Sequence, residues 1–481
     1  MEALLLKDAK AGLVTNISSL RSEPEWLLNQ RLEALKLFQK LPQEKSPLYA
    51  KYSDLKEVDF KGVDLSSVGS TSPQEAKIPQ ELQFTVKDVE VKSSLFQVDN
   101  KVVNIVLDEE YRKKGVVLTD IATALQEMPD LVRSYFSAKG ISPEEDKFVA
   151  LNHAFFNSGI FLYVPKYVVI EEPIQTLFLS NTSGVSVFNR NLIVVEEGSS
   201  IKFVEEAYST DSAKADGHSI YSATTELHLG QGAEIAFGGI QNLGENVINL
   251  VNRRSIGGGN SRITWSIGYF GGGLTRARLD NVMAEPNAST EDMEIVFADN
   301  AQRFDIVSDL THRSPSTKGT VLVRGVLRNK AQAIFKGMIK IDKGAKNSEA
   351  YLAEHAMLLG RGARANAVPG LEIETNEVKA THSASVALID DEDIFYLMSR
   401  GLSEDEAHRM AVLAFLEPAV RRIPSSNIRF RIWYLLERKW LGDKGAQLKP
   451  EDMIEPVEEV KEVGRSGPQE FFESHYKYSG D

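Results

Sequence analysis

The sequence contains EEGSSIKF at 196–203, GQGAEIAF at 230–237, RNKAQAIF at 328–335, DKGAKNSE at 342–349 and GRGARANA at 360–367. Each segment has a polar turn, then Gly or Lys, then a small residue, and then the start of a strand. Glycine permits a positive φ at a corner, and Ala or Ser fits where successive coils stack closely. The spacing is near one or two turns of a parallel β-helix, so the pattern favours a solenoid over chance recurrence of hairpin turns.

The sequence around these segments is strand-like from Gly159 to Leu388. Short runs of Val, Ile, Phe and Leu alternate with polar residues and are interrupted by Gly and Asn. Such a texture fits a sandwich, a barrel or a solenoid. Because the corners recur, we predict a mainly β protein whose core, residues 159–388, is a right-handed parallel β-helix.

Residues 1–158 mix helical patterns with short strands. Ser22 and Glu25 have the spacing of a capping box, which predicts a helix that begins there and ends before Pro42. Two more helical segments are expected in this region, at 119–136 and 143–156.

Helical patterns return in residues 389–445. The stretch DDEDIFYLMSRGL (390–402) has acids in its first turn, Arg400 in its last turn and Gly401 just after it. This charge order suits the helix dipole, and glycine is a common helix stop, so a helix is predicted here.

Two features follow this first C-terminal helix. Ser403 and Glu406 form a second capping-box pattern, and apolar residues at 427–440 recur at helical spacing, so two further helices are expected. Residues 446–481 are acidic and have no steady apolar period, which predicts a loose tail.

Composition restricts the possible partners and the compartment. The 481 residues carry a formal net charge of −13, and an acidic surface repels nucleic acid. No run of 18 apolar residues and no signal-peptide pattern is present, so no membrane span is expected and a cytoplasmic location is predicted.

The chain has no cysteine. Disulfides, zinc–thiolate sites, thiol nucleophiles and an all-thiolate iron–sulfur site from this chain alone are therefore excluded. The P-loop, the G-x-S-x-G elbow and the H-E-x-x-H helix motif are also absent, so we expect no ATP site and no enzymatic activity. The glycine clusters at 257–259 and 271–273 are interpreted as turns.

Histidine is the natural iron or zinc ligand where thiolate is missing. Three histidines fall within the late coils of the expected solenoid: His312, His355 and His382. A β-helix brings successive coils close together, so these positions could meet, although a single histidine is more often structural.

The stretch from 369 to 418 resembles the C-terminal signature of the SufB/SufD family. The family pairs a P-x-LEI strand with an H-[GSA]-A-[ST] strand, followed by an [IL]-F-Y-L-x-SRG-[IL] helix. Here these elements are Pro369–Ile373, His382–Ser385 and Ile394–Leu402. The segments at 148–174, 271–285, 311–327 and 333–341 also resemble the family, so about three quarters of the chain is covered.

The resemblance implies a scaffold for iron–sulfur cluster assembly. The family fold is a right-handed parallel β-helix flanked by helical domains, which agrees with the repeats. Family members form SufB–SufD or SufB–SufB pairs that bind the ATPase SufC through the C-terminal helices. A transient cluster is built between the two β-helices, and the sulfur enters through SufB cysteines.

Two features resemble the SufD branch. SufB typically has a glutamate directly after the family histidine, where this chain has Ser383, and SufB also needs cysteines that are missing here. The EPEW segment at 23–26 instead resembles SufB N-termini, which leaves a SufB/SufD-like homodimer open. A β-helix carbohydrate-active enzyme is a third reading, but it would need clustered acids.

The resemblance also implies site residues. His382 matches the family histidine at the cluster-forming interface and is expected to be an iron or cluster ligand, the alternative being a residue that buttresses the interface. The ATPase-binding hairpin would include Phe395, Tyr396, Arg400 and Gly401. Deletion from Asp391 onward is expected to abolish ATPase binding and to leave the β-helix folded.

Overall fold

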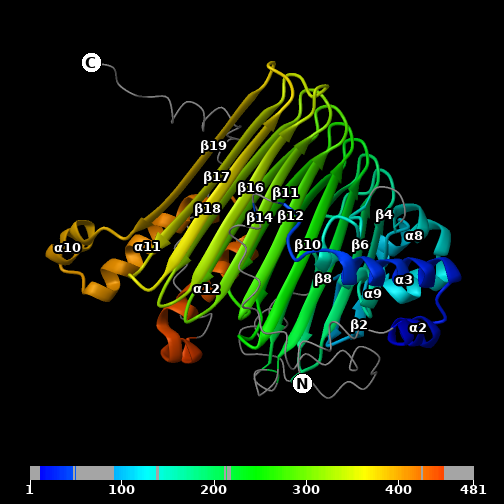
Figure 1. Ribbon diagram of the computed structural model, residues 1–481, viewed down its shortest axis with the longest axis horizontal. Helices are drawn as coiled ribbons and strands as arrows, with labels where there is room; N and C mark the ends of the chain where they lie inside the picture. Colours follow the sequence, from blue (N-terminus) through cyan, green and yellow to red (C-terminus); the bar gives the residue numbers. More distant parts are fainter. Residues whose placement is uncertain are drawn as a thin grey trace.

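The computed structural model describes residues 11–46, 49, 92–136, 140–210, 213, 218–423 and 426–448. It contains a parallel β-solenoid of about eight turns with helices before and after it (Figure 1). The predicted mainly β, parallel solenoid fold is therefore confirmed. The acidic tail expected at 446–481 lies almost entirely outside the described residues.

Each turn of the solenoid contributes one strand to each of two sheets. Sheet A contains, in spatial order, β19 (Lys379–Leu388), β17 (Glu349–Leu358), β15 (Lys318–Leu327), β13 (Ser289–Ala298), β11 (Arg262–Tyr269), β9 (Glu234–Asn242), β7 (Ser200–Ser209), β5 (Ile174–Ser180), β1 (Ser94–Val98) and β2 (Lys101–Val106). Sheet B contains β18 (Arg364–Ile373), β16 (Gln332–Ile341), β14 (Arg303–His312), β12 (Leu274–Met283), β10 (Val247–Gly257), β8 (Ser219–Leu229), β6 (Val187–Val195), β4 (Ile160–Val164) and β3 (Val117–Asp120).

All the strand pairs from β4 to β19 are parallel, and the antiparallel pairs β1–β2 and β3–β4 occur at the N-terminal end. From β4 to β19, the odd-numbered strands belong to sheet A and the even-numbered strands to sheet B, so the chain passes to the other sheet after every strand. The last strands in the sequence, β18 and β19, are consequently the outermost strands of their sheets.

The predicted corner chemistry is confirmed at most of the repeated segments. Left-handed φ values occur at Gly198, Gly232, Asn329 and Asn347, where glycine or asparagine relieves the strain of a positive φ. The small residues that close the five corners are at most 4% exposed: Ser199, Ala233, Ala331, Ala345 and Ala363. Close stacking of the coils therefore explains the small-residue pattern.

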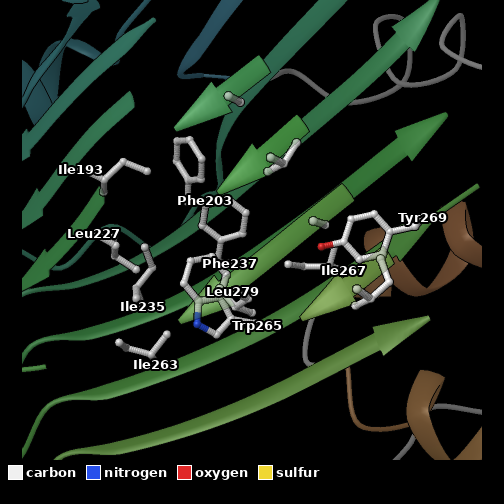
Figure 2. Close-up of a cluster of buried hydrophobic side chains, with 14 of the residues drawn as sticks. Ile193, Phe203, Leu227, Ile235, Phe237, Ile263, Trp265, Ile267, Tyr269 and Leu279 are labelled. Carbon is white, nitrogen blue, oxygen red and sulfur yellow. The ribbon is translucent and has the colours of Figure 1, made fainter. Parts of the chain in front are cut away.

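Side chains that point inward from both sheets form one long apolar core. Phe203, Phe237 and Trp265 stack on successive strands of sheet A, with ring centroids 5.1 and 4.5 Å apart (Figure 2). The indole Nε1 of Trp265 donates a 2.8 Å hydrogen bond to Asn281, so its polar atom is satisfied inside the core.

Helices cover the outer faces of the two sheets. The N-terminal helices on the sheet B side are α2 (Ala11–Leu20), α3 (Glu25–Lys40), α7 (Ile121–Glu127), α8 (Pro129–Phe136) and α9 (Lys147–Phe155). The short α6 (Glu109–Lys113) instead packs Tyr111 against the solenoid core. The C-terminal helices on the sheet A side are α11 (Glu404–Val420) and α12 (Ser426–Leu441). Helix α10 (Asp391–Ser399) packs against α11, and a 3₁₀ helix at Gly442–Gln447 follows α12. Among the described residues, no helix is both long and apolar enough to cross a membrane.

Two sequence-based details of the N-terminal region are wrong. Helix α3 begins at Glu25 after Pro24, and Ser22 does not cap it but adopts a left-handed φ of 52°. Glu23 instead pairs with the buried Arg31 at 2.6 Å.

The helix expected at 119–136 is interrupted. Its first residues belong to β3, Asp120 caps the short α7, and a new helix begins at Pro129. Proline has no backbone N–H and favours the first turn of a helix, which explains the break.

Candidate functional site: the open end of the solenoid and the C-terminal hairpin

The C-terminal end of the solenoid is open. Strand β19 pairs with β17 and β18 pairs with β16, and no strand among the described residues pairs with their outer edges. Four large apolar side chains of this last coil are 40–53% exposed: Leu371, Ile373, Val386 and Leu388. Exposed edges and exposed apolar side chains together are typical of a surface that a partner covers.

His382 lies on this end. Its Cα pairs in register with Leu352 of β17, which is fully buried in the solenoid core. Paired residues of neighbouring strands share a face, so the imidazole belongs to the inward face of the last coil while remaining exposed at the open end. Thr381 and Ser383 lie on the opposite face.

The three late histidines do not come together. His312 is buried on β14, its Nδ1 is 2.7 Å from the Thr317 hydroxyl, and burial lowers its pKa to about 4. His355 points outward from β17 and lies 2.7 Å from the Ser385 hydroxyl. Within the described part of the chain, no group of three or more His, Asp or Glu residues could hold a metal ion.

The glycine clusters lie at corners, as interpreted from the sequence. The backbone of Leu243 leaves no room for a Cβ on Gly271, and that of Glu245 leaves none on Gly273. Close approach of adjacent coils therefore explains these glycines, and no helix follows them that could bind a phosphate.

A line of buried polar residues inside the solenoid was missed in the sequence. Glu205 pairs with Arg253 at 2.5 Å, and Glu294 accepts a hydrogen bond from the hydroxyl of Ser308. Asp292 is fully buried beside Glu294, and burial raises the pKa of both carboxyls. An acid at an inward position of an otherwise apolar strand would have identified these residues, but the inward positions are known only once the strand register is known.

Glu354 is the buried acid nearest to the open end. It is fully buried on β17, and its carboxylate has no hydrogen bond of ordinary geometry, although the Val368 amide approaches it. Burial, followed by the charges of Asp309 and Glu294, raises the pKa of Glu354 to about 8. An unpaired polar group in such a place costs about 1–3 kcal/mol of stability.

We predict that Glu354→Gln raises the free energy of unfolding, and that the gain grows between about pH 5 and pH 8. The folded-state pKa lies above the unfolded value, so the folded wild type holds an extra proton in this window and loses stability as the pH rises. The limiting slope is about 1.4 kcal/mol per pH unit. Urea unfolding at several pH values measures it, with Glu372→Gln on the exposed face of β18 as the control. Parallel curves for the wild type and Glu354→Gln would contradict the prediction.

The C-terminal hairpin consists of α10 and α11. The Asp390 side chain caps α10 by accepting from the Glu392 amide at 2.8 Å, and Gly401 ends the turn with a φ of 99°. Ser403 and Glu406 form the predicted capping box of α11, which is confirmed. The hairpin therefore begins and turns where the sequence indicated.

The hairpin exposes a patch of large side chains. Phe395 is 72% exposed and Tyr396 is 56% exposed, and Met398 and Met410 are also exposed. The guanidinium of Arg400 lies 5.0 Å from the Tyr396 ring centroid and donates to its hydroxyl at 3.1 Å. In Figure 1, α10 projects from the molecule close to the strands of the open end.

Helix α12 fixes the hairpin to several coils of the solenoid. Ile428 and Ile432 fill positions where Gly238 and Gly268 have no side chain. The ammonium group of Lys439 donates to the Phe297 carbonyl and the Gln302 side chain, each at 2.6 Å. The helices of this region share a buried core with sheet A, so deletion from Asp391 onward would also uncover that core.

Comparisons with known proteins agree with this arrangement. The SufBD core domain model of the SUF iron–sulfur cluster assembly system matches residues 178–415, and the SufBD N-terminal region model matches residues 16–176. The iron–sulfur cluster assembly protein SufD of Bacillus subtilis is 32% identical over 88% of this chain and 96% of its own.

Staphylococcal proteins are similar to this chain as well. An iron–sulfur cluster assembly SufBD family protein of Staphylococcus epidermidis is 31% identical over 86% of this chain and 89% of its own length. A Staphylococcus aureus relative with the same family name is 30% identical over the same shares. The two family models and these relatives cover most of the chain, and the chain therefore belongs to the SufBD family of SUF iron–sulfur cluster assembly proteins.

Proposed function

We propose that this chain is a non-enzymatic, SufD-like scaffold subunit on which iron–sulfur clusters are assembled. The observation that supports it best is the open end of the solenoid, where unpaired strand edges, exposed apolar side chains and His382 occur together. A scaffold needs surfaces that bind partners. Membership of the SufBD family indicates the process in which these partners take part, which is iron–sulfur cluster assembly.

The first partner is a SufB-like subunit, which covers the open end with its own last coil. Edge strands with free N–H and C=O groups favour addition of further strands, and the exposed apolar residues provide area to bury. If two copies of this chain paired instead, a two-fold axis would place the same strands antiparallel across the interface. That homodimer is the second candidate.

The second partner is a SufC-like ATPase, which binds the hairpin patch formed by Phe395, Tyr396, Met398 and Met410 with Arg400. Exposed aromatic and Met side chains on a compact helical hairpin are suited to a groove on a partner. ATP binds to that partner, since this sequence has no P-loop.

The iron–sulfur cluster is the cargo and is held transiently between the subunits. His382 contributes imidazole nitrogen from this side, and the partner contributes the thiolate, because this chain has no cysteine. Mixed His and Cys ligation is known chemistry for iron–sulfur centres.

We predict that His382→Ala lowers cluster loading on the reconstituted complex at least several-fold. The side chain is exposed on an outermost strand, so its removal leaves no core cavity, and subunit association and partner ATPase activity should be unchanged. The measurements are iron and sulfide content after anaerobic reconstitution, with subunit stoichiometry from native mass spectrometry. The matched control is His408→Ala, a partly exposed histidine on α11. Equal loading of wild type and His382→Ala would make His382 a structural residue.

A further inference from the structure

Each of the two outermost coils carries a single polar side chain toward the solenoid interior. In the last coil it is His382, and in the coil beneath it is Glu354. These two coils consist of β16, β17, β18 and β19. The strand registers show that their other inward positions are apolar or glycine: Ala333, Phe335, Gly337, Ile339, Ile341, Ala350, Leu352, Ala356, Leu358, Ala365, Ala367, Pro369, Leu371, Ile373, Ala380, Ala384, Val386 and Leu388.

The strand register places Glu354 and His382 on the same face. Glu354 pairs with Ala384 and Leu352 pairs with His382, so the acid and the imidazole are diagonal neighbours on adjacent strands. Diagonal neighbours have Cα atoms about 7–8 Å apart. Directly above Glu354 the last coil has only the methyl group of Ala384, so little side-chain bulk separates the acid from the open end.

The Glu354 carboxylate shares the space next to a glycine with the Leu352 side chain. A Cβ on Gly337, across the interior on β16, would lie 3.1 Å from Oε1 of Glu354 and 2.3 Å from the Leu352 side chain. The carboxylate is completely buried and its oxygens lack hydrogen bonds of ordinary geometry. An apolar side chain of similar size would fill this position without an unsatisfied polar group, so packing alone does not account for an acid here.

We propose that Glu354 is a positioning residue of the open end: its carboxyl group releases its proton to solvent when a divalent metal ion binds at His382, and the resulting negative charge holds the ion. The inference rests on the proposed function, since it assumes that the open end receives cargo. Imidazole and carboxylate are both suited to divalent first-row metals. When a partner covers the end, water is excluded and the attraction between the carboxylate and the ion becomes stronger. Water or the partner supplies the remaining ligands, because His382 and Glu354 are the only inward polar side chains on the described strands of the two outermost coils.

The experiment uses the full-length chain paired with its SufB-like subunit, and anaerobic Co²⁺ as the probe. Co²⁺ reports its ligands through visible absorption, and a titration gives its dissociation constant. We expect His382→Ala to remove the histidine-dependent band, and Glu354→Gln to weaken Co²⁺ binding about tenfold or more while preserving the pair. Glu354→Asp should restore part of the affinity. The matched control is Asp292→Asn, which removes an inward acid two coils deeper.

The experiment distinguishes failure of this inference from failure of the proposed scaffold function. Unchanged Co²⁺ affinity in a folded, paired Glu354→Gln protein would overturn the inference and leave the scaffold function intact. Equal weakening by Asp292→Asn would also overturn it, because the effect would then be that of any interior charge. Absence of a His382-dependent band in the wild-type pair would overturn the metal site itself. Failure of the wild-type chains to pair, measured by light scattering, would instead count against the proposed function, and this inference would fall with it.

Discussion

Replacing Val386 and Leu388 with aspartate is expected to abolish pairing of this chain through the open end of its solenoid. Both side chains are exposed, at 40% and 53%, on the inward face of the outermost strand of sheet A. Burying a charged group without a partner in an interface costs several kcal/mol. We therefore expect affinity for the partner subunit to fall by at least about 100-fold, which corresponds to about 2.7 kcal/mol.

The chain provides a matched control at its opposite end. Val103 and Ile105 of β2 are 43% and 36% exposed on the other outermost strand of sheet A. Aspartate at both positions adds the same charge to the same kind of strand and should leave pairing unchanged. The measurement is analytical ultracentrifugation of each variant with the partner subunit. Loss of pairing in the β2 variant, or normal pairing in the β19 variant, would show that the open end is not the interface.

The fold could be predicted because its strongest constraints are local. A corner that needs a left-handed residue favours Gly or Asn, and a buried stacking position favours Ala or Ser, so Gly198 with Ser199 and Gly232 with Ala233 carry a repeating signal. The capping box at Ser403 was likewise visible, since all its atoms lie within four residues. Each of these features depends on neighbours in sequence.

The parts that sequence reasoning missed depend on the register between distant strands. Glu354 looks like an ordinary surface acid in the sequence, and only its pairing between Val323 and Ala384 shows that it points inward. The same holds for Asp292, which lies between Trp265 and Val321. At Ser22 the local pattern was misleading, because Pro24 occupies the N-cap position of α3 and Glu23 pairs with Arg31 inside the helix.

The C-terminal helices proposed to bind the ATPase are joined to the solenoid by polar contacts. Arg324 donates to the Phe415 carbonyl of α11, and Arg431 of α12 pairs with the buried Glu206 of β7. The region is thus part of the folded body, and its removal would confuse lost binding with lost stability. Substitutions confined to the exposed patch of α10 avoid this difficulty.

Replacing both Phe395 and Tyr396 with alanine is expected to abolish capture of the SufC-like ATPase. These aromatic side chains are 72% and 56% exposed, so their truncation costs little folding energy. Buried aromatic residues at interfaces contribute about 2–4 kcal/mol each when truncated, so the pair together should weaken binding at least 100-fold. Isothermal titration of the ATPase into each variant measures the change.

The matched control is Tyr167→Ala, which removes an aromatic side chain that is 69% exposed at a corner of the solenoid. It should bind the ATPase with wild-type affinity. Circular dichroism and thermal melting of the double variant should match the wild type, because α10 keeps its Asp390 cap and its buried Ile394. Wild-type ATPase affinity in the folded double variant would place the ATPase on another surface, whereas equal loss in Tyr167→Ala would indicate a nonspecific effect of exposed aromatic residues.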